Sequence, residues 1–426
     1  MNFILKGSIC YSISPKEFMT LENGYLVCEG GISRGIFSEI PDKFSGFPIN
    51  DCGNKIIIPG LIDLHVHAPQ YAYRGLGMDL QLLNWLSTYA FAEESKYSNP
   101  AYADEAYNAF VSDLKRGATT RANVFATIHN PATILLMEKL EQSGLVTHVG
   151  KVNMDRNSPD ILREASAQVS YEDTRCWIKQ VKGKFKNTRP IITPRFIPTC
   201  SDELMQGLGV LQREYGLPVQ SHLSENDEEI AWVDELHPKS KSYAEAYNSF
   251  GLFGNNAAAP TVMAHCVHSA GAEEALIKQN GVYVAHCPQS NTNLASGIAP
   301  IRRFLDNGLR IGLGSDVAGG CHTSIFRAMS DAIQVSKLYW RLIEQNDVPL
   351  TEKEAFYLGT AGGGSFFGKV GSFEDGYEFD ALVIDDSSIH PQPSRNLSIE
   401  NRVARIIYLA GDVAICGKYV CGKNIF

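Results

Sequence analysis

Strand-like and helix-like segments alternate through the middle of the chain, and this alternation limits the fold more than any other feature of the sequence. Short apolar runs recur from about residue 57 to about residue 316, and a helical pattern separates each run from the next. Eight such units predict an α/β fold built on a parallel, closed (β/α)8 TIM-like barrel. A doubly wound open sheet is the alternative, but no G-x-G-x-x-G follows the first strand. The expected strands are 57–64, 119–125, 145–153, 190–196, 217–222, 261–265, 282–286 and 310–314.

Both ends of the chain have a different texture, in which short strand-like runs are broken by turns at close intervals. Near the C-terminus, Phe379–Ile384 and Val403–Leu409 read as two such strands. Because the two ends share this character, we expect residues 1–56 and 372–426 to pair into a small composite β-sandwich domain. Residues 57–371 would then form the barrel beside it.

Composition and charge exclude several classes of protein. Apolar residues make up 44% of the chain and charged residues 20%, which argues against widespread disorder. The formal net charge of −9 disfavours nucleic acid or an anionic membrane as a partner. No apolar run reaches membrane-spanning length, and the N-terminus lacks the layout of a signal peptide. The 10 cysteines include no C-x-x-C pair, so we expect reduced thiols in a cytoplasmic protein.

Metal-binding side chains stand at the same end of several predicted strands. The active sites of (β/α)8 barrels lie at the C-terminal ends of the strands, so these side chains should meet there. Imidazoles with one carboxylate suit Zn2+, or Fe2+ as an alternative, whereas Mg2+ and Ca2+ require more oxygen ligands. The sequence therefore predicts a catalytic metal site at this rim. The side chains are His65 and His67 after the first strand, His222 on the fifth, His265 on the sixth, His286 on the seventh and Asp316 after the eighth.

Hydrolysis at such a metal also needs a group that carries a proton. Glu225 lies three residues after His222, where its carboxyl could reach both water and substrate. The alternative is a solvated glutamate at a helix N-terminus, since Glu225 stands just before an acidic run. His265 could be a further metal ligand, or it could hold the attacking water together with Asp316, and we favour the second role.

The sequence blocks that carry these residues resemble the amidohydrolase superfamily. These blocks are P-G-L-I-D-L-H-V-H at 59–67, S-H-L-S-E at 221–225, M-A-H-C at 263–266 and G-L-G-S-D-V-A-G-G at 312–320. A further set of blocks is similar, within that superfamily, to the guanine deaminases. They are A-P-Q-Y at 68–71, F-A-T-I-H at 125–129, V-G-K-V-N-M-D at 149–155, T-P-R-F at 193–196 and A-H-C-P-Q-S-N at 285–291.

This resemblance implies one metal ion per chain, Zn2+ or alternatively Fe2+. Glu225 would be the proton shuttle, and His265 with Asp316 would position the hydroxide that attacks the substrate. Binuclear members of the superfamily bridge two metals with a modified lysine at the end of the fourth strand. Arg195 stands there in this chain, which argues for a single metal. The ligands that the resemblance implies are His65, His67, His222 and Asp316.

The resemblance also implies hydrolytic deamination of guanine to xanthine and ammonia, in purine catabolism or salvage. Arg195 suits this substrate, because a guanidinium only donates hydrogen bonds and guanine presents a carbonyl oxygen that adenine lacks. A surface salt bridge is the alternative role for Arg195. Phe196 could stack on the purine ring, and Gln70 could pair with another edge of the base. The implied substrate contacts are Gln70, Arg195, Phe196, His222, Glu225 and Asp316.

Two other functions stay open from the sequence. The first is an aminohydrolase of the same fold that acts on a pterin, a triazine, cytosine or an adenosine derivative. The second is a non-catalytic scaffold that keeps the barrel without its chemistry. For the deaminase reading we expect guanine as the small-molecule partner and a homodimer as the assembly.

Overall fold

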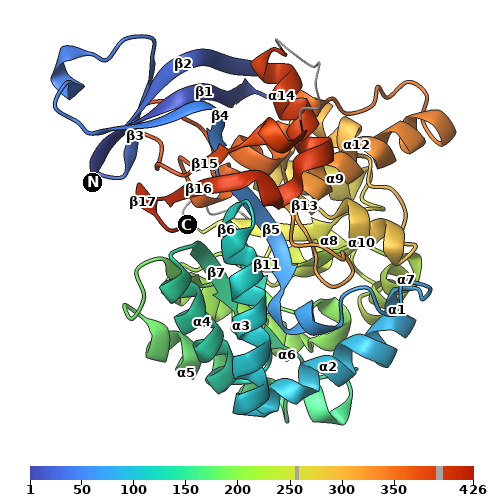
Figure 1. Cartoon of the computed structure of the whole chain (residues 1–426). Helices are drawn as coiled ribbons and strands as arrows, with labels where there is room; N and C mark the ends of the chain where they lie inside the picture. Colours follow the sequence, from blue (N-terminus) through green and yellow to red (C-terminus); the bar gives the residue numbers. More distant parts are fainter. Residues whose placement is uncertain (255–258, 390–396) are drawn as a thin grey trace.

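The structure is a computed structural model that describes residues 1–254, 259–389 and 397–426. Figure 1 shows strands from both ends of the chain gathered on one side, next to a larger unit in which helices surround a ring of strands. Within the described residues, every helix is too short or too polar to cross a lipid bilayer.

The ring is a closed barrel of parallel strands, as the alternating pattern predicted. Two four-stranded sheets, β5-β6-β7-β9 and β11-β12-β13-β14, make up its wall, and the short pair β8–β10 continues two of the strands. The backbone N–H of Asp316 donates to the carbonyl of His65 at 2.8 Å, and that of Gln220 donates to Ile192 at 2.9 Å, which closes both gaps between the sheets. The strands are β5 (Leu61–His67), β6 (Thr119–Phe125), β7 (Val146–Gly150), β8 (Val152–Asn153), β9 (Thr188–Pro190), β10 (Thr193–Pro194), β11 (Val219–Leu223), β12 (Thr261–His265), β13 (Tyr283–His286) and β14 (Arg310–Leu313).

The first predicted strand, 57–64, was placed wrongly, because it spans two strands that belong to different sheets. Strand β4 (Ile49–Pro59) lies outside the barrel, and β5 begins after Gly60. The chain crosses from one sheet to the other at Gly60, where an added Cβ would lie 2.2 Å from Oγ1 of Thr120. Only glycine fits so close an approach. The strand prediction failed here because two buried apolar runs flank this short crossing.

Strands from both chain ends share one sheet, in the part of the chain where we expected a composite β-sandwich domain. The sheet is continuous and seven-stranded, with the order β17-β16-β15-β4-β1-β2-β3. Strand β4 joins the two ends, since it pairs with β1 on one side and with β15 on the other. The exact division of the chain into domains stays our prediction. The remaining strands are β1 (Asn2–Ser14), β2 (Glu17–Glu29), β3 (Ile32–Phe37), β15 (Ala381–Ile384), β16 (Ile415–Val420) and β17 (Lys423–Asn424).

The predicted strand Val403–Leu409 is wrong, because the chain is helical there. Helix α14 (Ile399–Arg405) begins after Ser398, whose side chain accepts a hydrogen bond from the backbone N–H of Asn401. Its buried side chains recur three and four residues apart, which is the period of a helix. They are Ile399, Val403, Ile406 and Ile407.

The helices that surround the barrel mostly begin and end where the sequence signals stand. The side chain of Asn99 caps α3, with Pro100 at its first position, and that of Ser201 caps α6. Gly216 ends α6 in the left-handed conformation. The helices are α1 (Leu82–Trp85), α2 (Phe91–Ser95), α3 (Pro100–Arg116), α4 (Asn130–Ser143), α5 (Ala167–Val181), α6 (Asp202–Tyr215), α7 (Asp227–Leu236), α8 (Tyr243–Ser249), α9 (Ala272–Asn280), α10 (Pro288–Asn293), α11 (Ile301–Asp306), α12 (Ile325–Leu342) and α13 (Glu352–Tyr357).

The sheet meets the N-terminal ends of β5 and β6 through buried charges. Nε of Arg121 on β6 lies 2.6 Å from Oδ2 of Asp380, and its Nη2 lies 2.8 Å from Glu378. Nζ of Lys418 donates to three carbonyls at the end of α3, at 2.8 to 3.2 Å. The partial negative charge of a helix C-terminus favours a cation there, but burial lowers the pKa of Lys418 to about 7. We call Arg121, Glu378, Asp380 and Lys418 the joint.

Candidate metal centre and pocket

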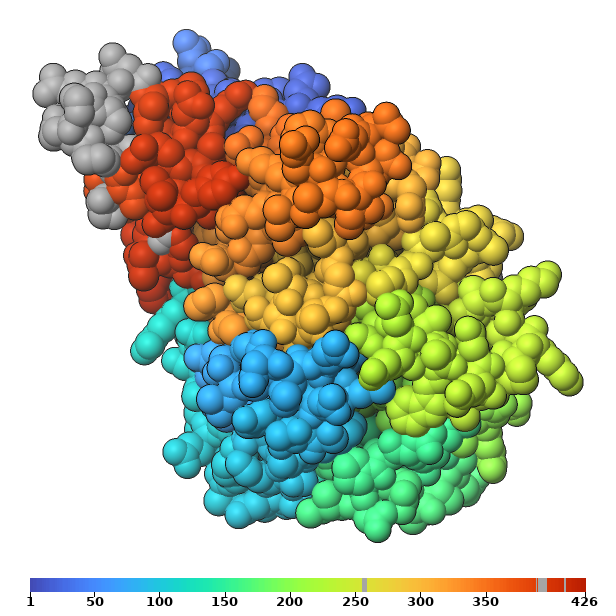
Figure 2. Space-filling view, turned by 90° about the vertical axis from the view of Figure 1, so that its right-hand side faces the viewer, coloured from blue at the N-terminus to red at the C-terminus, as the bar shows by residue number. Residues whose placement is uncertain are grey.

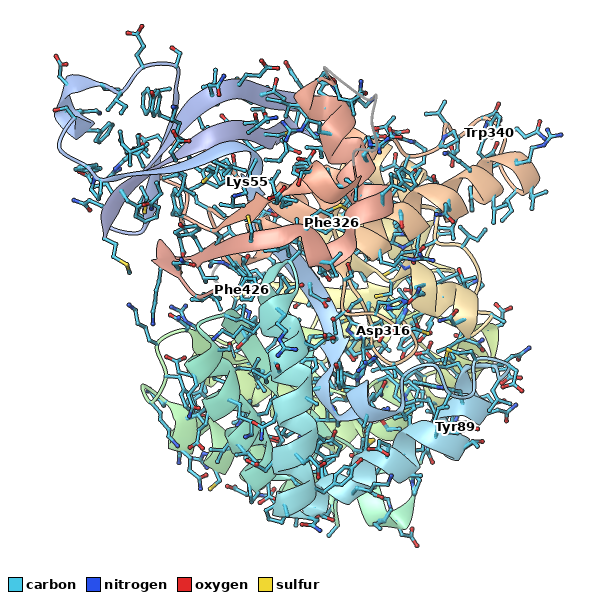
Figure 3. All side chains as sticks on the ribbon, in the orientation of Figure 1. Lys55, Tyr89, Asp316, Phe326, Trp340 and Phe426 are labelled. Atoms are coloured by element: carbon cyan, nitrogen blue, oxygen red, sulfur yellow. The ribbon has the colours of Figure 1, made fainter. Side chains whose placement is uncertain are left out.

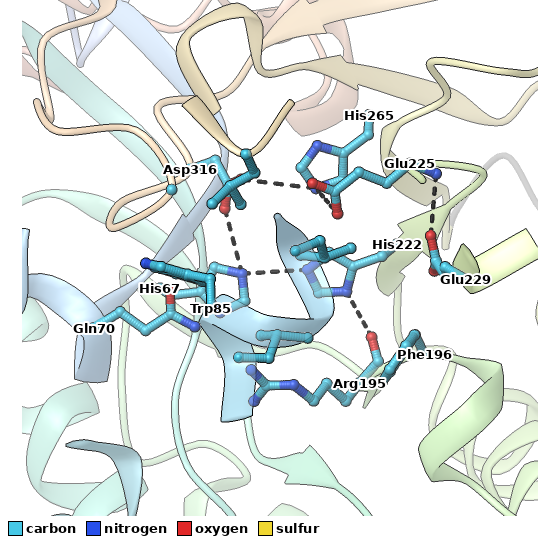
Figure 4. Close-up of a pocket in the computed structure, with 14 residues that line it drawn as sticks. His67, Gln70, Trp85, Arg195, Phe196, His222, Glu225, Glu229, His265 and Asp316 are labelled. Atoms are coloured by element: carbon cyan, nitrogen blue, oxygen red, sulfur yellow. Dashed lines mark hydrogen bonds and ion pairs between the residues drawn. The ribbon is translucent and has the colours of Figure 1, made fainter. Parts of the chain in front are cut away.

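The side chains that the sequence placed at the strand ends meet in one pocket at the C-terminal rim of the barrel (Figure 4). The pocket is partly open to solvent. His65 and His286 are not among the lining residues; His286 is buried, and neither of its ring nitrogens has a hydrogen-bond partner within the described part of the chain. The lining residues are His67, Gln70, Leu82, Trp85, Leu86, Arg195, Phe196, His222, Glu225, Glu229, His265, Leu294, Asp316 and Gly319.

Three imidazoles point their Nε2 atoms at one another. His65 and His67 lie two residues apart on β5, and their Nε2 atoms are 3.2 Å apart. Nε2 of His222, on β11, lies 3.3 Å from that of His67. Nδ1 of His222 donates to the backbone carbonyl of Arg195 at 2.6 Å. Because a carbonyl only accepts, Nδ1 carries the proton and the lone pair of Nε2 faces the other two rings.

Asp316 supplies a carboxylate to the same point. Its Oδ1 lies 3.1 Å from Nε2 of His65 and 3.5 Å from Nε2 of His67. Burial alone would raise the pKa of Asp316, but the charges of His65, His265 and His67 together hold that pKa well below its usual value. The carboxyl group is therefore ionised. Burial, and then the neighbouring His65, lower the pKa of both His67 and His222, which keeps these imidazoles neutral.

These four side chains fit a tetrahedral metal ion. In a tetrahedral site with ligands about 2.0–2.1 Å from zinc, neighbouring ligand atoms lie about 3.3–3.4 Å from each other. The measured separations of 3.1 to 3.5 Å lie around that value. Metal binds to an imidazole nitrogen that carries no proton and to an ionised carboxylate. Imidazoles with a carboxylate suit Zn2+ or Fe2+ better than Mg2+ or Ca2+, and the identity of the metal stays a prediction.

His265 and Glu225 lie beside this donor set. Nε2 of His265 is 3.3 Å from Oε2 of Glu225 and 3.7 Å from Oδ2 of Asp316, and its Nδ1 contacts Oδ1 of Asn291 at 2.8 Å. His265 is thus placed either to bind the metal or to hold a water between the two carboxyl groups. Glu225 is 3% exposed, which rules out the solvated helix-end alternative. Burial, and then the charge of Asp316, raise the pKa of Glu225 well above its usual value.

Several residues of the rim hold strained backbone conformations. His265, Asp316 and Ser224 have φ of 73°, 45° and 46°, in the left-handed region that favours glycine. Each such residue costs about 1–3 kcal/mol, and such residues are common at functional sites. Asp63 helps to hold this geometry: its carboxylate accepts from the backbone N–H groups of His65 at 3.1 Å and Ser315 at 3.0 Å. It thereby ties the first barrel strand to the loop that carries Asp316.

The three residues expected to contact a purine lie on another wall of the same pocket. Arg195 is 3% exposed, so the surface salt-bridge alternative is wrong. Its Nη1 lies 2.5 Å from Oε2 of Glu94, and Nε2 of Gln70 lies 2.8 Å from Oε1 of the same carboxylate. Phe196 is buried next to Arg195 and meets Trp232 edge-on. Sequence reasoning placed all three residues in the pocket but missed Glu94.

The missed pocket residues lie mostly in one segment, which Figure 2 shows in blue at the surface. The segment forms a 3-10 helix at Ala68–Tyr73 and, after turns at 74–81, a run of short helical segments from Leu82 to Ser98. Leu82, Trp85 and Leu86 form an apolar wall of the pocket. The aromatic side chains were visible in the sequence, but they follow no regular period. Adjacent glutamates at 93 and 94 were the only sign of Glu94, and a solvated helix face gives the same pattern.

Comparison with known proteins gives consistent results. Residues 56–424 match the sequence model of the Amidohydrolase family. The guanine deaminase of Dictyostelium discoideum is 40% identical in an alignment that covers 99% of this chain and 98% of that protein. A crystal structure of guanine deaminase from C. acetobutylicum, with guanine bound in the active site, superposes with a TM-score of 0.96 at 48% identity and covers 100% of both chains. The E. coli guanine deaminase superposes with a TM-score of 0.88 at 30% identity, over 100% of this chain and 99% of that one.

Proposed function

The chain belongs to the amidohydrolase family, and we propose that it hydrolyses guanine to xanthine and ammonia. The observation that carries this proposal is the position of Arg195. Its guanidinium lies in the same pocket as His67, His222, Asp316 and Glu225. A guanidinium only donates hydrogen bonds, so at this position it matches a substrate whose ring carries a carbonyl oxygen as well as the reacting carbon.

We propose one Zn2+ per chain, with Fe2+ as the alternative. When bound, such an ion supplies Lewis-acid chemistry that lets a water lose its proton near neutral pH. The residues that would hold it are His65, His67, His222 and Asp316, for which the separations and protonation states described above are the support.

Glu225 is the group that we propose to move protons. Burial and Asp316 raise the pKa of its carboxyl, which favours a group that can protonate the ring nitrogen next to C2 of guanine as water adds to C2. It then takes a proton from the added water and delivers it to the departing amino group, which leaves as ammonia. His265, 3.3 Å from Glu225 and 3.7 Å from Asp316, would hold the water between these carboxyl groups.

The remaining lining residues would bind the base. The N–H groups of Arg195 that do not contact Glu94 would donate to the 6-oxo group of guanine. Phe196 and Trp85 would contact the ring, and Gln70 would pair with a second edge. Adenine presents a donor where guanine has the oxygen, so Arg195 would be left unpaired and adenine would be rejected.

The test is an ammonia-release assay on the purified chain with guanine, adenine, cytosine and guanosine. We expect ammonia from guanine and little from the other three. Activity on any of them without activity on guanine would overturn the substrate assignment and favour the other aminohydrolase reading. No ammonia from any base, in a protein without stoichiometric metal, would favour the scaffold reading.

We also propose that the protein is a homodimer that acts in the cytoplasm, in purine catabolism or salvage. An exposed apolar patch supports self-association: Leu342 and Ile343 are 74% and 60% exposed at the end of α12, and Trp340 lies at the surface nearby (Figure 3). Light scattering on the purified protein tests the assembly. We expect twice the chain mass of 46.9 kDa, and a monomer at all concentrations would refute the dimer.

A further inference from the structure

One buried carboxylate joins two residues of the substrate wall. Glu94 is 2% exposed and lies on α2, in the segment that covers the pocket. One of its oxygens accepts from Gln70 and the other from Arg195, at 2.8 and 2.5 Å. Figure 4 shows Gln70 and Arg195 on the same side of the pocket, with the guanidinium directed toward Gln70. The proton-transfer steps above make no use of Glu94.

The amide of Gln70 has a fixed orientation because both of its ends are held. The backbone N–H of Ala318 donates to Oε1 of Gln70 at 3.1 Å. A backbone N–H only donates, so Oε1 must lie on that side and Nε2 must face Glu94. The second N–H of Nε2 is then available to donate to a ligand in the pocket. Glu94 thus determines the direction of the donor that Gln70 offers to a ligand.

Arg195 is held in the same way. Nη1 lies 2.5 Å from Glu94, and the guanidinium carbon lies 5.1 Å from the centre of the Phe91 ring, on the same helix. The other guanidinium N–H groups are then directed by a rigid plane. The Glu94 carboxylate also balances the charge of Arg195, so the wall offers donors without a net charge. Such a wall suits a neutral base with a carbonyl group.

We propose that Glu94 is a positioning residue that sets the preference for guanine by orienting Arg195 and Gln70. This inference rests on the proposed function, and it deepens that proposal because it explains how the wall recognises the 6-oxo group. Glu94 itself need not contact the substrate. Its effect should therefore appear in the recognition of the 6-oxo group and not in metal binding.

Replacement of Glu94 by glutamine leaves one mismatched contact in either orientation. If the new amide oxygen accepts from Arg195, its NH2 group faces Nε2 of Gln70, and two donors oppose each other. If Gln70 turns over to relieve this, its own NH2 group opposes the N–H of Ala318. The guanidinium also loses its counter-charge, so Arg195 should move away from its place.

The experiment compares Glu94→Gln with wild type on two ligands. Guanine has both the 2-amino and the 6-oxo group, whereas 2-aminopurine keeps the 2-amino group, lacks the 6-oxo group and is tested as a competitor of guanine. We expect E94Q to raise the KM for guanine about 10- to 100-fold, the effect of one misplaced charged hydrogen bond. The inhibition constant of 2-aminopurine should change less than about threefold, and the bound metal should stay at the wild-type amount.

Glu93→Gln is the matched control, since Glu93 lies next to Glu94 on the same helix and is also buried. Glu93 pairs with Lys96 at 2.6 Å and with Tyr102, both outside the pocket lining. E93Q should lower the melting temperature and leave the KM for guanine unchanged. If E94Q leaves the KM for guanine unchanged, or weakens both ligands equally, the inference is overturned. Absence of guanine turnover in wild type would instead refute the proposed function.

A second pair of variants covers the case in which E94Q does not fold. Arg195→Met leaves the buried Glu94 carboxylate without its counter-charge and should be less stable, whereas the double variant E94Q/R195M removes both charges and should fold. Because Glu94 acts mainly through Arg195, kcat/KM for guanine in the double variant should lie within about threefold of that in R195M. A further loss of more than about tenfold in the double variant would show that Glu94 acts by another route, and would overturn the inference.

Discussion

Two clusters of buried polar groups lie at opposite ends of the barrel strands, and they differ in how completely their members are paired. At the joint, the guanidinium of Arg121 meets two carboxylates, and the ammonium of Lys418 meets three carbonyls. At the rim, the Nε2 atoms of three imidazoles lie close together, and burial and then Asp316 raise the pKa of Glu225. The polar groups of the joint face partners within the protein, whereas the rim gathers donors that suit a metal cation.

The rim and the joint also differ in backbone conformation. His265 and Asp316 hold left-handed conformations at the rim, but none of the four joint residues does. A paired buried charge with ordinary backbone geometry is what a structural contact requires. Unpaired donors on a strained but well-held backbone indicate a site whose missing partner is a ligand. Both clusters contain buried charge, so buried charge by itself does not tell a binding site from a structural contact.

The largest effect that we expect comes from Glu225→Gln at the rim. Loss of the proton carrier should lower kcat for guanine about 10²–10⁴-fold. The melting temperature should stay the same or rise, because a carboxyl that burial and Asp316 disfavour has been removed. Glu228→Gln, in an exposed position of the same acidic run, is the control and should change neither quantity. A stable E225Q enzyme with wild-type kcat would contradict the claim that the rim residues carry out the reaction.

Arg121→Met should give the opposite result at the joint. It leaves Asp380, which is fully buried, without its counter-charge, and loss of one partner of a buried pair costs about 3–5 kcal/mol. Urea unfolding should show this loss, while the protein that remains folded keeps its kcat/KM for guanine. Arg189→Met replaces an exposed arginine and should leave both quantities unchanged. A large fall in kcat/KM for R121M would mean that the two ends are not independent.

A smaller effect should come from His148, on β7 at neither cluster. Burial, aided by the charges of Arg189 and Arg121, lowers the pKa of His148 to about 3. The unfolded chain, with a histidine pKa of about 6.5, therefore binds a proton first as the pH falls, and stability is lost below that value. Between pH 7 and pH 5 this histidine should account for a loss of about 2 kcal/mol. The free energy of unfolding of His148→Phe should fall by that much less than the wild-type value between pH 7 and pH 5. If the two proteins show the same pH dependence, the role assigned to His148 is refuted.

The sequence predicted the barrel and the rim because both depend on local signals that repeat. Caps and glycines mark the helix ends, and five of the eight predicted strands carry a metal-binding side chain at their C-terminal end, so the meeting of His65, His222 and Asp316 follows from the fold. The crossing at Gly60 was missed because two apolar strands read as one run. Val403–Leu409 failed because a short apolar run fits a strand as well as a buried helix.

Glu94 could not be predicted for a different reason. Its role comes from contacts with Gln70 and Arg195, which lie 24 and 101 residues away in the chain. The segment that carries it has no hydrophobic period, so no local rule gives its path over the pocket. Long-range packing of this kind becomes visible only when the whole chain has folded.

The most direct test of the contrast between the two ends is removal and return of the metal. Chelation should abolish ammonia release from guanine and lower the melting temperature, since an ion that binds only the folded state stabilises it. Addition of one equivalent of Zn2+ per chain should restore both quantities. Full turnover and an unchanged melting temperature in protein shown to be free of metal would contradict the claim that the rim is completed by a cation.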